Sequence, residues 1–172
     1  MIRRGGTAAC LLLAAVVAGC GVVPGLGAGS DQPTNQKAIP PIVPVGGGQT
    51  AQGQWQAVVY RTSDGWTCLE IMGGPGGSTC GQGPDGLLGI GYGTGPPDQE
   101  SLVTGGTAVD GAASVIVLLD DGRALPGAVV PVPPPVGAPG IKVFVVLVPA
   151  GRSPKRVDLL DAQGGSLKST DF

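Results

Sequence analysis

Apolar and polar residues alternate in short runs after residue 53, and this period of two is typical of half-buried β-strands. In the first run, Trp55, Ala57 and Val59 alternate with neighbours that include two glutamines. A second run, Thr67 to Met72, follows the turn signal Ser63-Asp64-Gly65. The pattern therefore predicts two strands separated by a turn.

Later runs continue the pattern. Ser114 to Leu119 and Arg123 to Val130 flank Asp121-Gly122, where glycine can supply the positive φ of a tight hairpin turn. Lys142 to Val148 is apolar on both faces, which is typical of a central strand. Three weaker segments add strands. Arg156 to Asp161 predicts a strand with Val157 and Leu159 on one side, and the residues after Gly165 predict a last strand that follows a Gly-Gly turn. Leu87 to Tyr92 predicts a short strand inside a long loop from Cys80 to Asp98.

These strands predict a single all-β domain over residues 54–172. No window after residue 20 repeats apolar residues at a helical period, and frequent glycine and proline disfavour helices. A small antiparallel β-sandwich, immunoglobulin-like in the loose architectural sense, is the favoured fold, and a small β-barrel is the alternative. Pro131 and Pro133-Pro134-Pro135 cannot donate ladder hydrogen bonds, so they belong at a sheet edge or in a connection between sheets.

The segment before this domain has the composition of a linker. Residues 21–53 are rich in glycine and proline, contain few charges and show no sustained period. We therefore expect residues 20–53 to form a flexible tether.

The first nineteen residues have the build of a secretory leader. Arg3 and Arg4 form a positive start, Ala8 to Val17 an apolar stretch, and small residues precede Cys20. The apolar stretch falls short of the roughly 20 residues that span a bilayer.

Val17, Ala18, Gly19 and Cys20 match a lipobox, so the leader resembles that of a bacterial lipoprotein precursor. The resemblance implies cleavage before Cys20, a diacylglyceryl group on its sulfur and an extracytoplasmic protein anchored to the outer face of the cell membrane. The alternative is an ordinary secretory leader cleaved near Ala18. The usage of glycine, alanine, valine and proline resembles actinobacterial lipoproteins, but the folded domain resembles no family that would assign functional residues.

The sequence carries 10 basic and 12 acidic residues. Loss of Arg3 and Arg4 with the leader leaves eight basic residues, hence a net charge of −4. Nucleic acids and anionic lipid surfaces both attract clustered lysine and arginine, so this balance argues against either as the main partner.

Of the four cysteines, Cys10 lies in the leader and Cys20 carries the lipid, so Cys68 and Cys80 are predicted to pair. A structural crosslink is favoured over a redox couple, because there is no C-x-x-C spacing and no histidine to lower a thiol pKa.

The absence of histidine excludes serine-histidine-aspartate and cysteine-histidine catalysis as well as histidine-based metal sites. Asp120 and Asp121 precede Gly122 and suit a turn better than a pair of catalytic carboxylates. The motif G-x-G-x-x-G at residues 81–86 opens no helical pattern and is rejected as a dinucleotide site. We therefore expect neither an enzyme nor a cofactor or metal.

Trp66 and Tyr92 are candidates for an interaction surface near the disulfide, because exposed aromatic residues are good anchors. The alternative is that Trp55 and Trp66 fill the core beside the disulfide. Two functions follow as hypotheses: a non-catalytic module that recognises a protein or an envelope component, or a carrier of a lipid or other apolar ligand.

Overall fold

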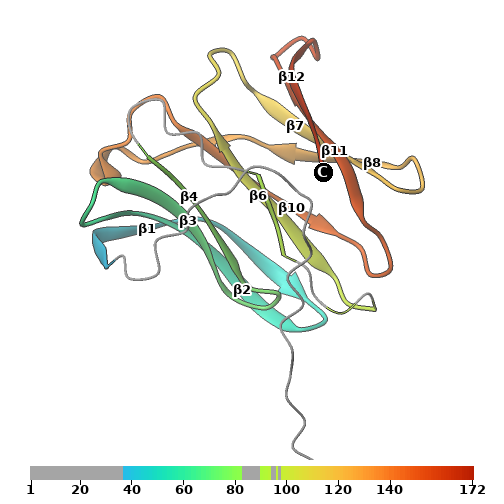
Figure 1. The fold of residues 1–172 in the computed structure, drawn as a ribbon, viewed down its shortest axis with the longest axis horizontal. Coiled ribbons are helices and arrows are strands. Elements are labelled where there is room, and N and C mark those ends of the chain that lie inside the picture. Colours follow the sequence, from blue (N-terminus) through green and yellow to red (C-terminus); the bar gives the residue numbers. More distant parts are fainter. Residues whose placement is uncertain (1–36, 83–89, 94–95, 97) are drawn as a thin grey trace, which may run out of the picture.

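The computed structural model describes residues 37–82, 90–93, 96 and 98–172, and these residues form an antiparallel all-β domain that is not closed into a barrel (Figure 1). The described strands form three four-stranded sheets. Cys68 and Cys80 form the disulfide. The predicted sandwich and its crosslink are thus confirmed. No helix in this described part is long and apolar enough to cross a membrane.

Sheet A has the order β1-β2-β3-β4, and its strands are consecutive antiparallel hairpins. Their bounds are β1 Ala38–Thr50, β2 Gly53–Thr62, β3 Trp66–Gly73 and β4 Gly77–Gln82. The predicted first and second runs are confirmed as β2 and β3. Because β4 includes Cys80, the predicted loop from Cys80 to Asp98 is wrong at its start, and residues 83–89 of that loop lie outside the described part.

The predicted tether is wrong for residues 38–53. Residues 38–50 form β1, which pairs with β2 from Ala38 opposite Thr62 to Thr50 opposite Gly53, and residues 51–52 form the turn between the two strands. Backbone hydrogen bonds build this ladder, so Gly46, Gly47 and Gly48 can pair without an apolar pattern. Two register shifts accommodate the prolines of this edge strand. The other tether residues, 20–36, and the leader with Val17, Ala18, Gly19 and Cys20 lie outside the described part.

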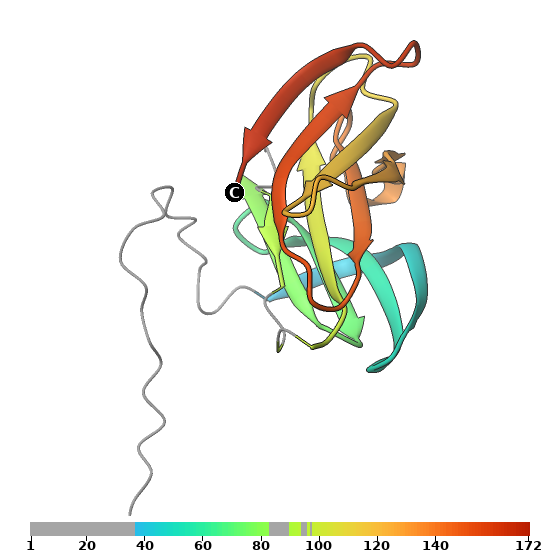
Figure 2. The ribbon, with the colours of Figure 1, turned by 90° about the vertical axis from the view of Figure 1, so that its right-hand side faces the viewer.

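Sheet B has the order β5-β6-β10-β9, and sheet C the order β12-β11-β7-β8. Their bounds are β5 Gly91–Tyr92, β6 Ser101–Thr107, β10 Lys142–Val148, β9 Val130–Pro131, β12 Ser166–Asp171, β11 Pro154–Leu160, β7 Ser114–Leu119 and β8 Ala124–Ala128. The predicted hairpin at Gly122 is confirmed: this residue has φ 83°, and its N–H donates to the Leu119 carbonyl. Sheet C lies toward the end of the molecule away from β1 (Figure 2).

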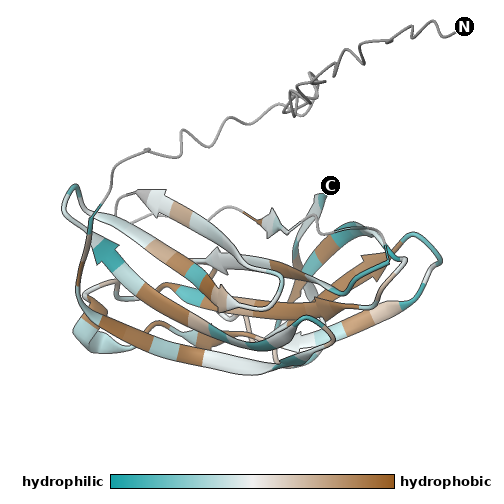
Figure 3. Ribbon diagram, turned by 90° about the horizontal axis from the view of Figure 1, so that it is seen from below, coloured by the Kyte–Doolittle hydropathy of each residue, from teal (hydrophilic) through white to brown (hydrophobic). Residues whose placement is uncertain are grey.

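Sheet B lies between the other two sheets and carries a core on each face. Leu102 and Val143 pack toward sheet A with Ala57, Val59 and Leu69. Val103, Phe144 and Val146 pack toward sheet C with Val115, Val117 and Val157. The predicted central strand, β10, therefore supplies side chains to both cores. Figure 3 shows that apolar residues gather in segments along the strands.

Pro131 and the three prolines that follow Val132 lie at a sheet edge and in a connection, as predicted from their lack of a backbone N–H group. Pro131 belongs to β9 at the edge of sheet B. The following prolines enter a single turn of 3-10 helix, η1, over Pro134–Val136, which connects β9 to β10. Val136 is buried in the core between sheets A and B, so this connection also closes one end of that core.

Candidate recognition surface on sheet A

Strand register separates the two faces of sheet A. β2, β3 and β4 pair without a register shift, so side chains alternate strictly between the faces. Ala57, Val59 and Leu69 face sheet B, where they are fully buried. The residues that alternate with these along each strand point to the other side of the sheet. We call this side the outer face, and its residues include Gln56, Val58, Tyr60, Trp66, Cys68, Glu70, Met72, Ser78 and Cys80.

The disulfide lies on the outer face and joins residues that stand directly opposite each other in the β3–β4 ladder. The sequence predicted that this crosslink closes a glycine-rich loop. The structure adds that it holds the two strands of a hairpin in register across the outer face. Cys68 is 1% exposed although it belongs to neither apolar core.

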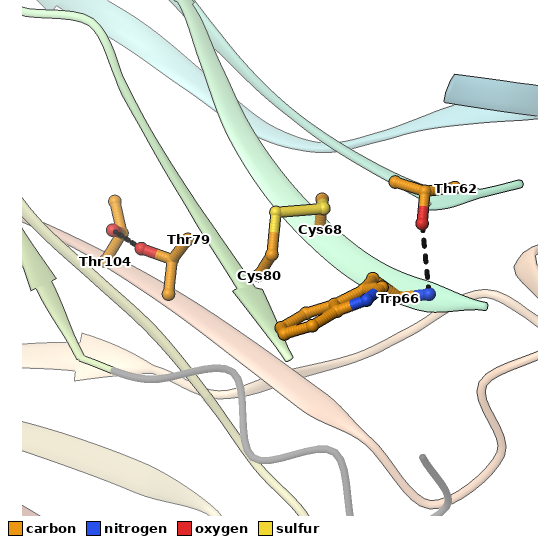
Figure 4. Close-up of a disulfide and its surroundings, with 6 residues drawn as sticks. All are labelled: Thr62, Trp66, Cys68, Thr79, Cys80 and Thr104. Atoms are coloured by element: carbon orange, nitrogen blue, oxygen red, sulfur yellow. Dashed lines mark hydrogen bonds between the residues drawn. A yellow bond between two sulfur atoms is a disulfide. The ribbon is translucent and has the colours of Figure 1, made fainter. Parts of the chain in front are cut away.

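Trp66 lies at the start of β3, beside the disulfide (Figure 4). Its backbone N–H donates to Thr62 Oγ1 at 3.0 Å, a bond that closes the turn before the strand. Its ladder partner is Gln82, so Cys80 is a diagonal neighbour on the same face. The indole is half-buried, and it places aromatic surface on the outer face.

Tyr92 lies on a different sheet from Trp66. It belongs to β5 of sheet B, is half-buried and packs against the core between sheets B and C. Its ring meets Phe172 edge to face at 6.1 Å, and its hydroxyl donates to the Arg152 carbonyl at 3.3 Å. These contacts attach the C-terminal residue to sheet B.

The two tryptophans have different environments. Trp55 packs against the core between sheets A and B, as the core alternative predicted for it. A side chain at its ladder partner Gly48 would place Cβ 3.0 Å from the indole nitrogen, so glycine allows the ring to lie across β1. Trp66 has the opposite parity and belongs to the outer face.

Sequence analysis missed a pair of polar residues on the outer face. Tyr60 on β2 hydrogen-bonds to the Glu70 carboxylate on β3. Burial of the phenol, together with this bond and the negative charge of Glu70, raises the pKa of Tyr60 to about 12. The two residues are ten apart in sequence, and only the β2–β3 register makes them neighbours.

Replacing Glu70 by glutamine is expected to lower the pKa of Tyr60 from about 12 toward, but not to, the ordinary value of 10.0. The negative charge is lost and the hydrogen bond becomes a weaker one to a neutral amide oxygen, whereas burial, the largest cause, remains. The folded state favours the neutral phenol, so Tyr60 contributes stability below pH about 10 that is lost as the pH rises through about 12. Ultraviolet titration in a Tyr92→Phe background measures Tyr60 alone, and an unchanged midpoint would contradict the assignment.

An open hollow of about 840 Å³ lies at the other end of sheet A, around the β1–β2 hairpin. The side chains of Gln49, Gln54, Gln56 and Met72 line it together with the three glycines of β1. Its lining contains no charged residue. Amide groups both donate and accept hydrogen bonds, so this hollow can contact uncharged polar groups.

The carboxylates considered in the sequence have a structural role. Asp121 accepts a hydrogen bond from the Arg123 backbone N–H and forms ion pairs with the Arg123 and Arg152 side chains. The backbone bond is the largest of the effects that lower the pKa of this carboxyl group. The turn interpretation is thus confirmed. Within the described ranges, no three histidine, cysteine or acidic residues gather in a way that could hold a metal ion.

Comparison of the chain with protein-family models, with curated proteins and with solved structures gave no match.

Proposed function

We propose that this chain is an extracytoplasmic lipoprotein, anchored through Cys20, whose β domain recognises a protein or another envelope component with the outer face of sheet A. The lipobox and the disulfide support the location, because disulfides persist in oxidising compartments. The domain serves as a binding module rather than as an enzyme.

The observation that carries this proposal is the composition of the outer face. Met72 is 52% exposed at the opposite end of β3 from the half-buried Trp66, and the half-buried Tyr60 and the disulfide lie between these two residues on the same face. The opposite face of the same strands packs against sheet B. Aromatic residues and methionine are enriched at protein interfaces, and Trp and Tyr dominate their binding energy. A crosslinked ladder also presents these groups in a fixed arrangement, which lowers the entropic cost of binding.

The carrier hypothesis has less support. Side chains of the two cores occupy the spaces between the sheets, and the hollows on sheet A are open to solvent. An apolar ligand is normally enclosed over most of its surface. Recognition at the surface therefore accounts better for the arrangement of the described residues.

Photo-crosslinking in cells tests the proposal. A photoreactive residue at Met72 is expected to yield a discrete adduct, whereas the same residue at Leu167, an exposed position on β12, is expected to yield none. Adding Trp66→Ala is expected to reduce the adduct at least about tenfold, the effect of losing an anchor worth about 1.4 kcal/mol. Replacing Cys20 by serine is expected to release the chain from the membrane fraction.

Two results would contradict the proposal. An adduct at Met72 that persists unchanged with Trp66→Ala would show that the outer face is not the recognition surface. A lipid that co-purifies in a fixed ratio, with no adduct at Met72, would favour the carrier function.

A further inference from the structure

Sheet A also carries an exposed apolar patch at the end where the described chain begins. Ile39 is 45% exposed and Ile42 is 51% exposed. Pro40 and Pro41 lie between them in β1 and are exposed as well, and exposed Pro135 of η1 borders the same hollow. We call these five residues the N-terminal patch. Exposed apolar surface of this kind marks an interaction site with a protein or a membrane.

Strand pairing and hydrogen bonds fix the position of the patch on the domain. Ile39 pairs with Arg61 in the β1–β2 ladder. The Arg61 guanidinium donates to the carbonyls of Gly137 at 3.1 Å and Gly65 at 2.7 Å, which ties β2 to the residue after η1 and to the β2–β3 turn. Val136 beneath is buried. A hollow of about 310 Å³ between these elements lies open beside Ile39.

The position of the patch along the chain identifies what covers it. Seventeen residues, Gly21 to Lys37, separate Cys20 from the first residue of β1. At 3.3–3.6 Å per residue they reach at most about 60 Å. On the proposed function, Cys20 is embedded in the bilayer, so the end of the domain that bears the patch is the end attached to the membrane. Because the connection to Cys20 is short, the patch stays close to the bilayer at a high effective concentration, so even a weak contact between them can form.

The charges near the patch are compatible with an anionic lipid surface. Lys37 immediately precedes β1 and is exposed, and the half-buried Arg61 lies beside the hollow. Asp64 in the β2–β3 turn supplies one opposing carboxylate. The chain as a whole is acidic, whereas the basic groups named here outnumber the carboxylate beside them.

We propose that the N-terminal patch docks on the surface of the bilayer that holds Cys20, with the side chains of Ile39 and Ile42 inserted among the lipids. The inference rests on the anchoring part of the proposed function. Docking fixes the orientation of the domain, so that it does not tumble freely on its connection to Cys20.

Nuclear magnetic resonance of isoleucine δ1-methyl groups tests the docking. The full lipidated chain is placed in nanodiscs of phosphatidylcholine and phosphatidylglycerol that contain a gadolinium-chelating lipid. The methyl signals of Ile39 and Ile42 are expected to broaden at least several-fold more than that of Ile116 on β7, which is a matched probe on sheet C. Equal broadening of the three signals in an anchored chain would overturn the proposal.

A paired variant gives a second readout. The double replacement Ile39→Ser and Ile42→Ser is expected to add a fast component to the decay of tryptophan fluorescence anisotropy, because the undocked domain tumbles independently of the disc. The control Leu167→Ser removes a side chain of similar exposure from sheet C and is expected to leave the decay unchanged. A decay that is the same in the double variant and the wild type would also overturn the proposal. A wild-type chain that does not remain with the discs would instead contradict anchoring through Cys20.

Discussion

Replacing Phe144 by alanine is expected to lower the free energy of unfolding by about 3–5 kcal/mol, the usual cost of deleting a buried phenylalanine. Phe144 is 2% exposed and lies on β10, the strand that contributes to both cores. Its ring lies over Gly105, its direct partner on β6: a Cβ there would be 2.5 Å from the Phe144 Cζ atom. The deletion therefore leaves a cavity in the middle of the core between sheets B and C.

Chemical denaturation followed by circular dichroism measures this loss. Met72→Ala is the matched control, because Met72 is 52% exposed and its truncation is expected to cost well under the loss at Phe144. Gly105→Ala alone is expected to destabilise the domain through the clash of its Cβ with the ring. In Phe144→Ala with Gly105→Ala the clash is absent, so the two losses are expected to be less than additive. Strict additivity would contradict the packing of the ring on the glycine.

Removing the disulfide is expected to cost about 3 kcal/mol, the loop-closure value for a crosslink between residues 12 apart. The double replacement of Cys68 and Cys80 by alanine isolates this effect. The crosslink joins opposite residues of a hairpin whose connecting turn, residues 74–76, includes two glycines, so without it the unfolded segment regains a large freedom.

The measurement is the denaturation midpoint with and without reductant. Reductant is expected to lower the midpoint of the wild type to about that of the double alanine variant and to leave the variant unchanged. A wild type that reductant fully converts to thiols without a shift would contradict a stabilising role. Trp66 lies beside the crosslink, so in a Trp55→Phe background tryptophan fluorescence reports whether the outer face loses its order at the same step.

The strand pattern could be predicted wherever side chains alternate in chemistry. The β7–β8 hairpin, β10 and β11 all follow from such runs, and Gly122 adopts the positive φ that its turn required. The pairing of the cysteines followed from elimination rather than from geometry. Sequence analysis missed β1, β4 and β6, which contain many glycine, serine and threonine residues. These small residues give little alternation of apolar and polar side chains, even in β6, where every residue is buried.

The candidate site could be predicted only in part. Trp66 and the disulfide were identified from their residue types, and the ladder places them together on one face. Tyr92 was identified by the same reasoning, yet β5 places it on sheet B against Phe172. Tyr60 and Glu70 gave no signal in the sequence, because a hydrogen bond across two strands depends on register.

The sequence by itself therefore determined that this chain makes antiparallel β-structure and where the turns at Gly65, Gly122 and Gly164 lie, because these properties depend on local side-chain chemistry and backbone freedom. Elimination among the four cysteines identified the pair. Only the tertiary structure decided that residues 38–50 join sheet A, that sheet B is covered on both faces, and that Trp55 faces the core while Trp66 faces outward. Alternation divides a strand into two faces, but which face is covered depends on the sheet that packs against it.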